Sequence, residues 1–140
     1  MDNTKTTHSA FKIALVDDNS INLELLETHM RMLENQVGIA IDTISFENGN
    51  DLMHYLEEHT LDLILLDRMM PELSGDEVCE MLKNDADYQH IPVIFVTSLY
   101  SDEHKSEGKR LGAEGYLTKP YIHTDIVNML TPIIERATGR

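Results

Sequence analysis

Four short apolar runs in this 140-residue chain are each followed by a residue whose side chain can bind a metal ion or a phosphate. The residues that follow the runs are Asp17 and Asp18, Asp67, Thr97 and Ser98, and Lys119 and Pro120. If the runs are parallel strands of one sheet, their carboxyl ends meet at one edge. That edge would carry three or four carboxylates, a hydroxyl and an ammonium group, which together can hold a divalent cation and receive a phosphoryl group.

Strand-like and helix-like stretches alternate along the whole chain. The expected strands are 12–16, 39–44, 61–66, 91–96 and 115–118, and a helix is expected after each. Five such units predict a parallel sheet with helices on both faces. Right-handed crossovers and a central first strand favour a single flavodoxin-like (βα)5 domain of the α/β class, with strand order 2-1-3-4-5. In that order the first, third and fourth strands are neighbours, which predicts that their polar ends lie close together.

Two helices illustrate how strongly the pattern varies. The first is expected from about Ser20 to Glu34, with Ser20 as its N-cap and four apolar residues facing inward: Leu25, Leu26, Met30 and Leu33. The segment 101–110, by contrast, has no large apolar residue, and its Gly108 costs a helix about 1 kcal/mol relative to alanine. We expect this fourth helix to be the least firmly packed and to be mobile.

Composition argues against several classes of function. The formal net charge of −14 disfavours binding to nucleic acid and to an anionic membrane surface. No run reaches the ~20 apolar residues that a membrane-spanning helix needs. The single cysteine, Cys79, forms no internal disulfide and no cysteine-based zinc set, and its helical spacing predicts a packed thiol. Residues 1–10 are polar, lack the apolar stretch of a signal peptide and are predicted to be a flexible tail, so we expect a cytoplasmic protein.

Each acidic position has an ordinary explanation when it is taken alone. Asp17 and Asp18 could form a solvated turn, and Asp67 could be a turn residue or a helix cap. Together they would place three carboxylates within several ångströms, where each close pair repels by roughly a few kcal/mol at an effective dielectric constant of about 20. Such a cluster needs a compensating cation, and oxygen ligands that leave room for water and phosphate suit Mg²⁺. Asp67, which is single and central, is then the best nucleophile for phosphoryl transfer.

The hydroxyl and the ammonium group also have ordinary alternatives. Thr97 could be a β-branched strand residue, and Lys119 could be a surface lysine. At a strand end, however, Lys119 could pair with Asp67 and later bind a phosphoryl oxygen, to which the Thr97 hydroxyl could also donate. The bond between Lys119 and Pro120 could be cis or trans, and the sequence leaves both open.

Together these residues resemble the receiver domain of two-component response regulators. The resemblance covers about Phe11 to Arg136, within a predicted domain of residues 11–138. Four motifs carry it: Val16-Asp17-Asp18-Asn19-Ser20-Ile21-Asn22, Leu66-Asp67-Arg68-Met69-Met70-Pro71, Val96-Thr97-Ser98 and Gly115-Tyr116-Leu117-Thr118-Lys119-Pro120. Each motif is weak to moderate by itself, but the four in this order and at this spacing are a strong signal.

The resemblance implies that the chain is a phosphoacceptor switch in a two-component phosphorelay. Asp67 would accept a phosphoryl group from a phosphohistidine on a sensor histidine kinase or a histidine phosphotransfer protein. Asp18, Asp67 and the backbone carbonyl of Met69 would bind Mg²⁺ directly, and Asp17 would act largely through water. Lys119 would bind the phosphoryl oxygens, together with Thr97.

The resemblance also implies how the signal would leave the domain. Thr97 would move toward the phosphate and Tyr116 would turn inward, which would change the face made by helix four, strand five and helix five. That face would signal to an effector domain or a downstream protein, and it could also form a homodimer. The chain would assist its own phosphorylation and dephosphorylation but turn over no external substrate, so we expect a signalling module and not an enzyme.

Two alternative functions remain open for a chain with this fold. The same fold could serve as an interaction domain that works without phosphorylation, although the intact set of site residues argues against this. A phosphohydrolase with an aspartyl nucleophile is the other alternative, but such enzymes usually carry an acid/base carboxylate two residues after the nucleophile, where this chain has Met69. Arg68 should point to the opposite side of the strand end from Asp67, as a surface or partner-contacting residue.

Overall fold

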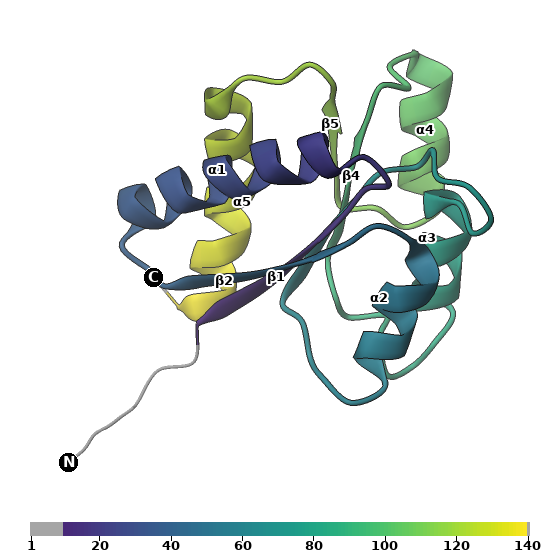
Figure 1. The fold of residues 1–140 in the computed structure, drawn as a ribbon, viewed down its shortest axis with the longest axis horizontal. Helices are drawn as coiled ribbons and strands as arrows, with labels where there is room; N and C mark the ends of the chain where they lie inside the picture. The colour runs from purple at the N-terminus through teal and green to yellow at the C-terminus, as the bar shows by residue number, and fades with distance from the viewer. Residues whose placement is uncertain (1–9, 140) are drawn as a thin grey trace.

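Strands and helices alternate along the chain as the sequence predicts. The structure, a computed structural model, describes residues 10–139, so the predicted flexible tail lies outside the described residues except for Ala10. Five βα units follow one another (Figure 1): β1 Phe11–Val16, α1 Ser20–Val37, β2 Ile41–Phe46, α2 Gly49–Leu56, β3 Leu63–Leu66, α3 Gly75–Lys83, β4 Val93–Thr97, α4 Asp102–Arg110, β5 Gly115–Thr118 and α5 His123–Thr138.

The five strands form one parallel sheet in the order β2-β1-β3-β4-β5, which confirms the predicted flavodoxin-like topology. Its two faces bury separate apolar clusters. Alternate β1 residues such as Ile13 and Leu15 pack with α1 and α5, whereas Ala14 and Val16 pack with α2 and α3. The sheet therefore lies between two layers of helices, as Figure 1 shows.

The start of α1 differs from the sequence prediction. Asn19, not Ser20, is the N-cap, because the Asn19 side chain accepts hydrogen bonds from the backbone N–H groups of Ile21 and Asn22. The buried stripe of α1 contains Leu23, whereas Leu25 is 48% exposed. The second strand is also displaced and runs from Ile41 to Phe46 in place of the predicted 39–44.

The helix α4 packs on the sheet through a glycine. Gly108 is its buried residue, and a Cβ atom added there would lie 3.0 Å from Cε1 of Tyr116 and 3.2 Å from Cδ2 of Phe95. The weak apolar face predicted for this segment is thus compensated by close approach of the helix backbone to two aromatic rings. Whether α4 is the most mobile helix stays a prediction.

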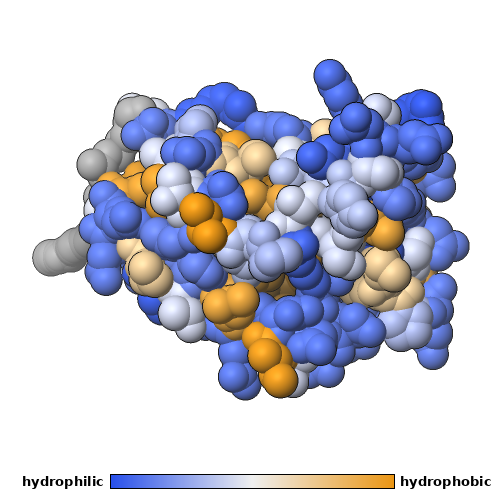
Figure 2. All heavy atoms as spheres, turned by 90° about the horizontal axis from the view of Figure 1, so that it is seen from above, coloured by the Kyte–Doolittle hydropathy of each residue, from blue (hydrophilic) through white to orange (hydrophobic). Residues whose placement is uncertain are grey.

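The outer surface of the domain is mostly polar. Hydrophilic side chains cover most of the face shown in Figure 2, and the apolar side chains there lie in small scattered groups. Within residues 10–139, none of the helices has the length and hydropathy needed to cross a membrane. Cys79 is fully buried, as predicted, and burial raises the pKa of its thiol to about 11.

Candidate functional site

Three aspartates meet at the carboxyl ends of β1 and β3. Val16 pairs with Leu66 in the sheet, so that Asp17 and Asp67 follow neighbouring residues, and the Asp67 N–H donates to the Val16 carbonyl at 3.0 Å. One carboxylate oxygen from each of Asp17, Asp18 and Asp67 lies within 4.8 Å of the others. Asp17 and Asp67 are buried, whereas Asp18 is exposed. The structure therefore brings together the three carboxylates that the sequence places at strand ends.

The ammonium group of Lys119 joins two of these carboxylates. Its Nζ donates to Oδ2 of Asp17 at 2.6 Å and to Oδ2 of Asp67 at 2.9 Å. Burial lowers the pKa of Lys119, but the hydrogen bonds and negative charges of the two aspartates outweigh burial and raise it above its usual value. Lys119 is therefore a cation at neutral pH. The peptide bond between Lys119 and Pro120 is cis.

Neighbouring N–H groups hold the two buried carboxylates in place. Oδ1 of Asp17 accepts from the Asn19 backbone N–H at 2.9 Å, and its Oδ2 accepts from Nδ2 of Asn22 at 3.3 Å. Oδ1 of Asp67 accepts from the Met69 backbone N–H at 3.1 Å. Asn22 has no role predicted from the sequence, although its position at the end of the first of the four motifs is a signal for one.

The arrangement suits a small divalent cation. Three carboxylates against the single ammonium group of Lys119 leave two formal negative charges in the cluster. Opposite ligands of an octahedral Mg²⁺ ion are about 4.2 Å apart, since each Mg–O bond is about 2.1 Å long. The aspartate oxygens lie within 4.8 Å of one another, which is close to that separation. The oxygen donors and their charge fit Mg²⁺ better than a softer metal.

The two remaining predicted residues lie on the neighbouring strands. Thr97 is fully buried at the carboxyl end of β4, and its Oγ1 accepts weakly from the Leu99 backbone N–H at 3.4 Å. Tyr116 pairs with Phe95 across β4 and β5, and its hydroxyl donates to the Leu99 carbonyl at 2.6 Å. The hydroxyl of Tyr116 is therefore bonded to the loop that connects β4 and α4.

Arg68 is buried, so the prediction that it lies on the surface is wrong. Its side chain is 4% exposed and forms two hydrogen bonds with Asp76, from Nε at 2.6 Å and from Nη2 at 2.8 Å. The side chain does leave the strand end away from the acidic cluster, but α3 and α4 cover it there. Its carboxylate partner lies in α3, a contact that strand alternation alone does not reveal.

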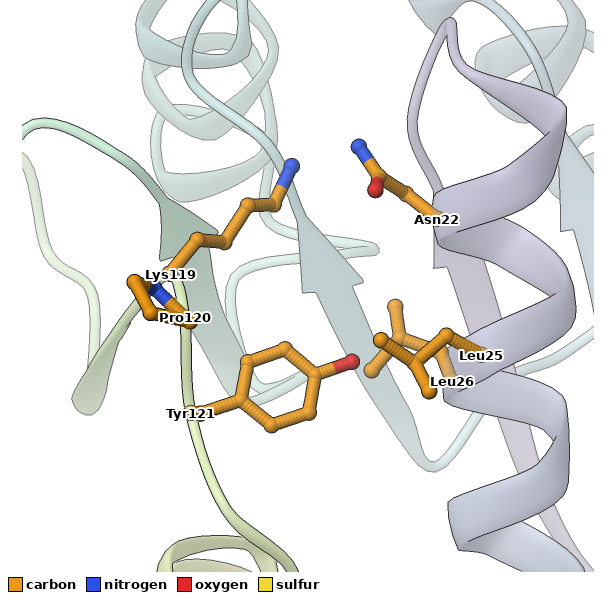
Figure 3. A pocket seen from close by; sticks show the side chains of 6 residues that line it. All are labelled: Asn22, Leu25, Leu26, Lys119, Pro120 and Tyr121. Carbon is orange, nitrogen blue, oxygen red and sulfur yellow. The ribbon is translucent and has the colours of Figure 1, made fainter.

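An apolar groove borders the cluster on the side of α1. It is lined by residues of α1 and of the segment after β5, which Figure 3 shows: Asn22, Leu25, Leu26, Lys119, Pro120 and Tyr121. Lys119 and Asn22 extend toward the same end of the groove, whereas the Tyr121 hydroxyl faces the two leucines (Figure 3). Burial, and then the charge of Asp17, raise the pKa of Tyr121 to about 12. The groove is thus continuous with the side chains that hold Asp17.

Known proteins match both the sequence and the fold. The chain is 37% identical over 108 residues to the polar-differentiation response regulator DivK of Brucella anthropi, covering 77% of this chain and 83% of DivK. It is 31% identical over 128 residues to the probable transcriptional regulator ycf27 of Cyanidium caldarium, covering 91% of this chain but 48% of ycf27. This chain therefore spans about half the length of ycf27.

Among solved structures, the BeF3-activated receiver domain of DrrB has a TM-score of 0.78 and 29% sequence identity, with 91% of this chain and 100% of that domain covered. The family model described as the response regulator receiver domain matches residues 13–131. That match begins inside β1, includes the other four strands in full and ends inside α5. With its sheet order and its cluster of aspartates, the chain belongs to the response regulator receiver domain family.

Proposed function

We propose that this receiver domain is the phosphoacceptor switch of a two-component phosphorelay, with Asp67 as the acceptor. The observation that carries the proposal is the meeting of Asp17, Asp18 and Asp67 with the ammonium group of Lys119 at one edge of the sheet. Asp67 is the central member of this cluster, because it follows β3, which lies between β1 and β4.

Phosphoryl transfer to Asp67 would proceed as a displacement at phosphorus. A carboxylate oxygen of Asp67 attacks the phosphorus atom of a phosphohistidine, and the bond between phosphorus and the imidazole nitrogen breaks. The bonding electron pair leaves with the imidazole, which takes up a proton, and Asp67 becomes an acyl phosphate. Lys119, already bonded to Asp67, would bind a phosphoryl oxygen, and the Thr97 hydroxyl would donate to another.

Asp18, Asp67 and the backbone carbonyl of Met69 would hold Mg²⁺ directly, and Asp17 would act through water. The bound ion would offset the charge of the carboxylates and of the incoming phosphoryl group. The fixed orientation of Asp17 supports its indirect role, since its oxygens accept from Asn19, Asn22 and Lys119. Asp18, which is exposed, is accessible to a cation from solvent.

The output would be a change in the face made by α4, β5 and α5, driven by Thr97 and Tyr116. A sensor histidine kinase or a histidine phosphotransfer protein would supply the phosphoryl group, and an effector domain or a downstream protein would recognise the changed face. A homodimer would use the same face. The acidic composition disfavours binding to nucleic acid, and the protein would work in the cytoplasm. The chain would assist its own phosphorylation and dephosphorylation and act on no external substrate.

The test is incorporation of one phosphoryl group from acetyl phosphate in the presence of Mg²⁺, followed by intact-protein mass spectrometry. Wild type should gain the group, and Asp67→Asn should not. Asp42→Asn, which changes an exposed carboxylate of β2, is the matched control and should label like wild type. Absence of labelling in wild type would favour an interaction domain that works without phosphorylation. Repeated turnover of a simple phosphate ester would favour a phosphohydrolase.

A further inference from the structure

Arg68 connects the strand end that carries Asp67 with two helices and with Tyr116. Besides its two bonds to Asp76 in α3, its Nη1 donates to the His104 carbonyl in the first turn of α4 at 2.6 Å. The same nitrogen donates to the Tyr116 hydroxyl at 3.2 Å. One guanidinium group thus contacts α3, α4 and β5.

The environment of Arg68 fixes the orientation of its guanidinium group. The guanidinium carbon lies 5.2 Å from the centre of the Phe95 ring and 6.0 Å from that of Tyr116, positions in which a cation is attracted to an aromatic face. The hydrogen bonds with Asp76 raise the pKa of Arg68 above its usual value, although burial opposes the increase. The group is therefore a permanent cation held from several sides.

Tyr116 contacts both this guanidinium group and α4. Its hydroxyl accepts from Arg68 and donates to the Leu99 carbonyl, which satisfies both hydrogen-bonding capacities of the oxygen inside the protein. The ring also lies against Gly108 of α4, where an added Cβ atom would be 3.0 Å from its Cε1. An outward rotation of Tyr116 would break both hydrogen bonds.

We infer that Arg68 is a positioning residue, which stabilises Tyr116 in the inward orientation expected of the switched state and connects the phosphoacceptor strand end directly to α4. The inference rests on the proposed function, because it names the side chain through which Asp67 reaches the output face. Arg68 is the next residue after Asp67, and its side chain donates one hydrogen bond to the α4 backbone. Asp67 and α4 are therefore connected through a single side chain.

A purely stabilising role would not need an arginine at this position. Replacing a buried ion pair by apolar residues of similar size is often neutral or stabilising, because the apolar residues avoid the cost of desolvating the charges. The arginine instead supplies a planar fork of donors, which specifies the relative positions of α3, α4 and the Tyr116 hydroxyl. The partner carboxylate, Asp76, is 38% exposed, so that water can hydrate it when Arg68 is removed.

The test compares Arg68→Met with Arg110→Met, a matched control on α4 whose side chain is 72% exposed. Backbone hydrogen exchange is measured for residues 99–110 and for α5 in protein that carries no phosphoryl group. A second measurement uses 3-fluorotyrosine incorporation and ¹⁹F NMR, with the Tyr116 resonance assigned by Tyr116→Phe. Both measurements are independent of phosphorylation, so that a failure of the proposed function does not change their result.

In Arg68→Met the amides of residues 99–110 should exchange about tenfold faster or more, the equivalent of one or two hydrogen bonds to a charged group. The amides of α5 should change by less than about twofold, since they belong to a separate packed element. The Tyr116 resonance should move toward the position of an exposed tyrosine. Arg110→Met should change neither measurement.

Asp76→Asn provides an independent variant, because it keeps Arg68 and removes the carboxylate charge that orients it. It should produce a smaller change of the same kind, confined to residues 99–110 and the Tyr116 resonance. An increase in exchange of similar size in all helices would show that Arg68 only stabilises the fold, and would overturn the inference. An unchanged Tyr116 resonance in both Arg68→Met and Asp76→Asn would overturn it as well.

Discussion

Replacement of Lys119 by methionine tests the electrostatics of the acidic cluster. The substitution keeps an unbranched side chain but removes the ammonium group that bonds Asp17 and Asp67. The side chains of Asp17 and Asp67 are 2% and 9% exposed, so that neither carboxylate gains full solvation when the cation is removed. We therefore expect a loss of stability that depends on whether Mg²⁺ is present.

The size of the loss follows from the two hydrogen bonds at 2.6 and 2.9 Å. A hydrogen bond to a charged group contributes about 1.5–3 kcal/mol, and breaking a buried ion pair costs about 3–5 kcal/mol. Asp17 keeps its bonds from Asn19 and Asn22, which favours the lower end of that range. The free energy of unfolding of Lys119→Met in EDTA should thus be about 3 kcal/mol below that of wild type, with a Tm lower by about 10 °C.

Urea and thermal denaturation, followed by circular dichroism, measure this difference in EDTA and again in Mg²⁺. Because the variant lacks a cation in the cluster, Mg²⁺ should stabilise it more than it stabilises wild type. Lys105→Met, which changes an exposed lysine of α4, is the control and should lie within about 0.5 kcal/mol of wild type. Equal stability of Lys119→Met and Lys105→Met in EDTA would refute the reasoning.

Three further outcomes are expected. Gly75→Ala should lower the Tm by about 10 °C or more, since its Cβ would lie 2.0 Å from the Asp67 carbonyl oxygen. Gly38→Ala should cost less, because it strains a left-handed φ of 70° but its Cβ would meet no packing neighbour within 4 Å. Similar Tm values would contradict the packing of α3. The free energy of unfolding should fall as pH rises from about 10 toward 12, because the raised pKa values of Lys119 and Tyr121 mean that the folded state retains protons that the unfolded chain loses. Urea titrations across that range should show a smaller fall for Tyr121→Phe. In native-state hydrogen exchange α4 should be less protected than α5, and equal protection would remove the expectation that α4 is the most mobile helix.

The sequence allowed prediction of the sheet and of the residues at its edge, because both depend on short-range patterns. Buried parallel strands read as apolar runs, and the carboxyl ends of such strands meet in space. Asp17, Asp67 and Lys119 come together for that reason alone, although 50 residues or more separate them along the chain. Because strand order alone brings these residues together, their proximity can be predicted without knowledge of side-chain contacts.

The burial and the partners of Arg68 could not be predicted from the sequence, because they depend on contacts between helices and loops. Arg68 is buried because α3 begins at Gly75, where the helix backbone approaches the strand end closely enough for the Gly75 N–H to donate to the Arg68 carbonyl at 3.0 Å. That approach brings Asp76 beside the guanidinium group. The alternation of side chains along a strand predicts the direction of Arg68 correctly, but it contains no information on which helix covers that direction.

The glycine contact between α4 and Tyr116 has a mechanical consequence. Most helices touch their neighbours through side chains, whose rotamers absorb small displacements without moving the helix axis. At Gly108 the backbone itself rests on the aromatic ring, with 3.0 Å between the ring and the position of a Cβ atom. A displacement of the ring toward α4 must therefore move the helix backbone itself, and α4 would shift as a rigid body.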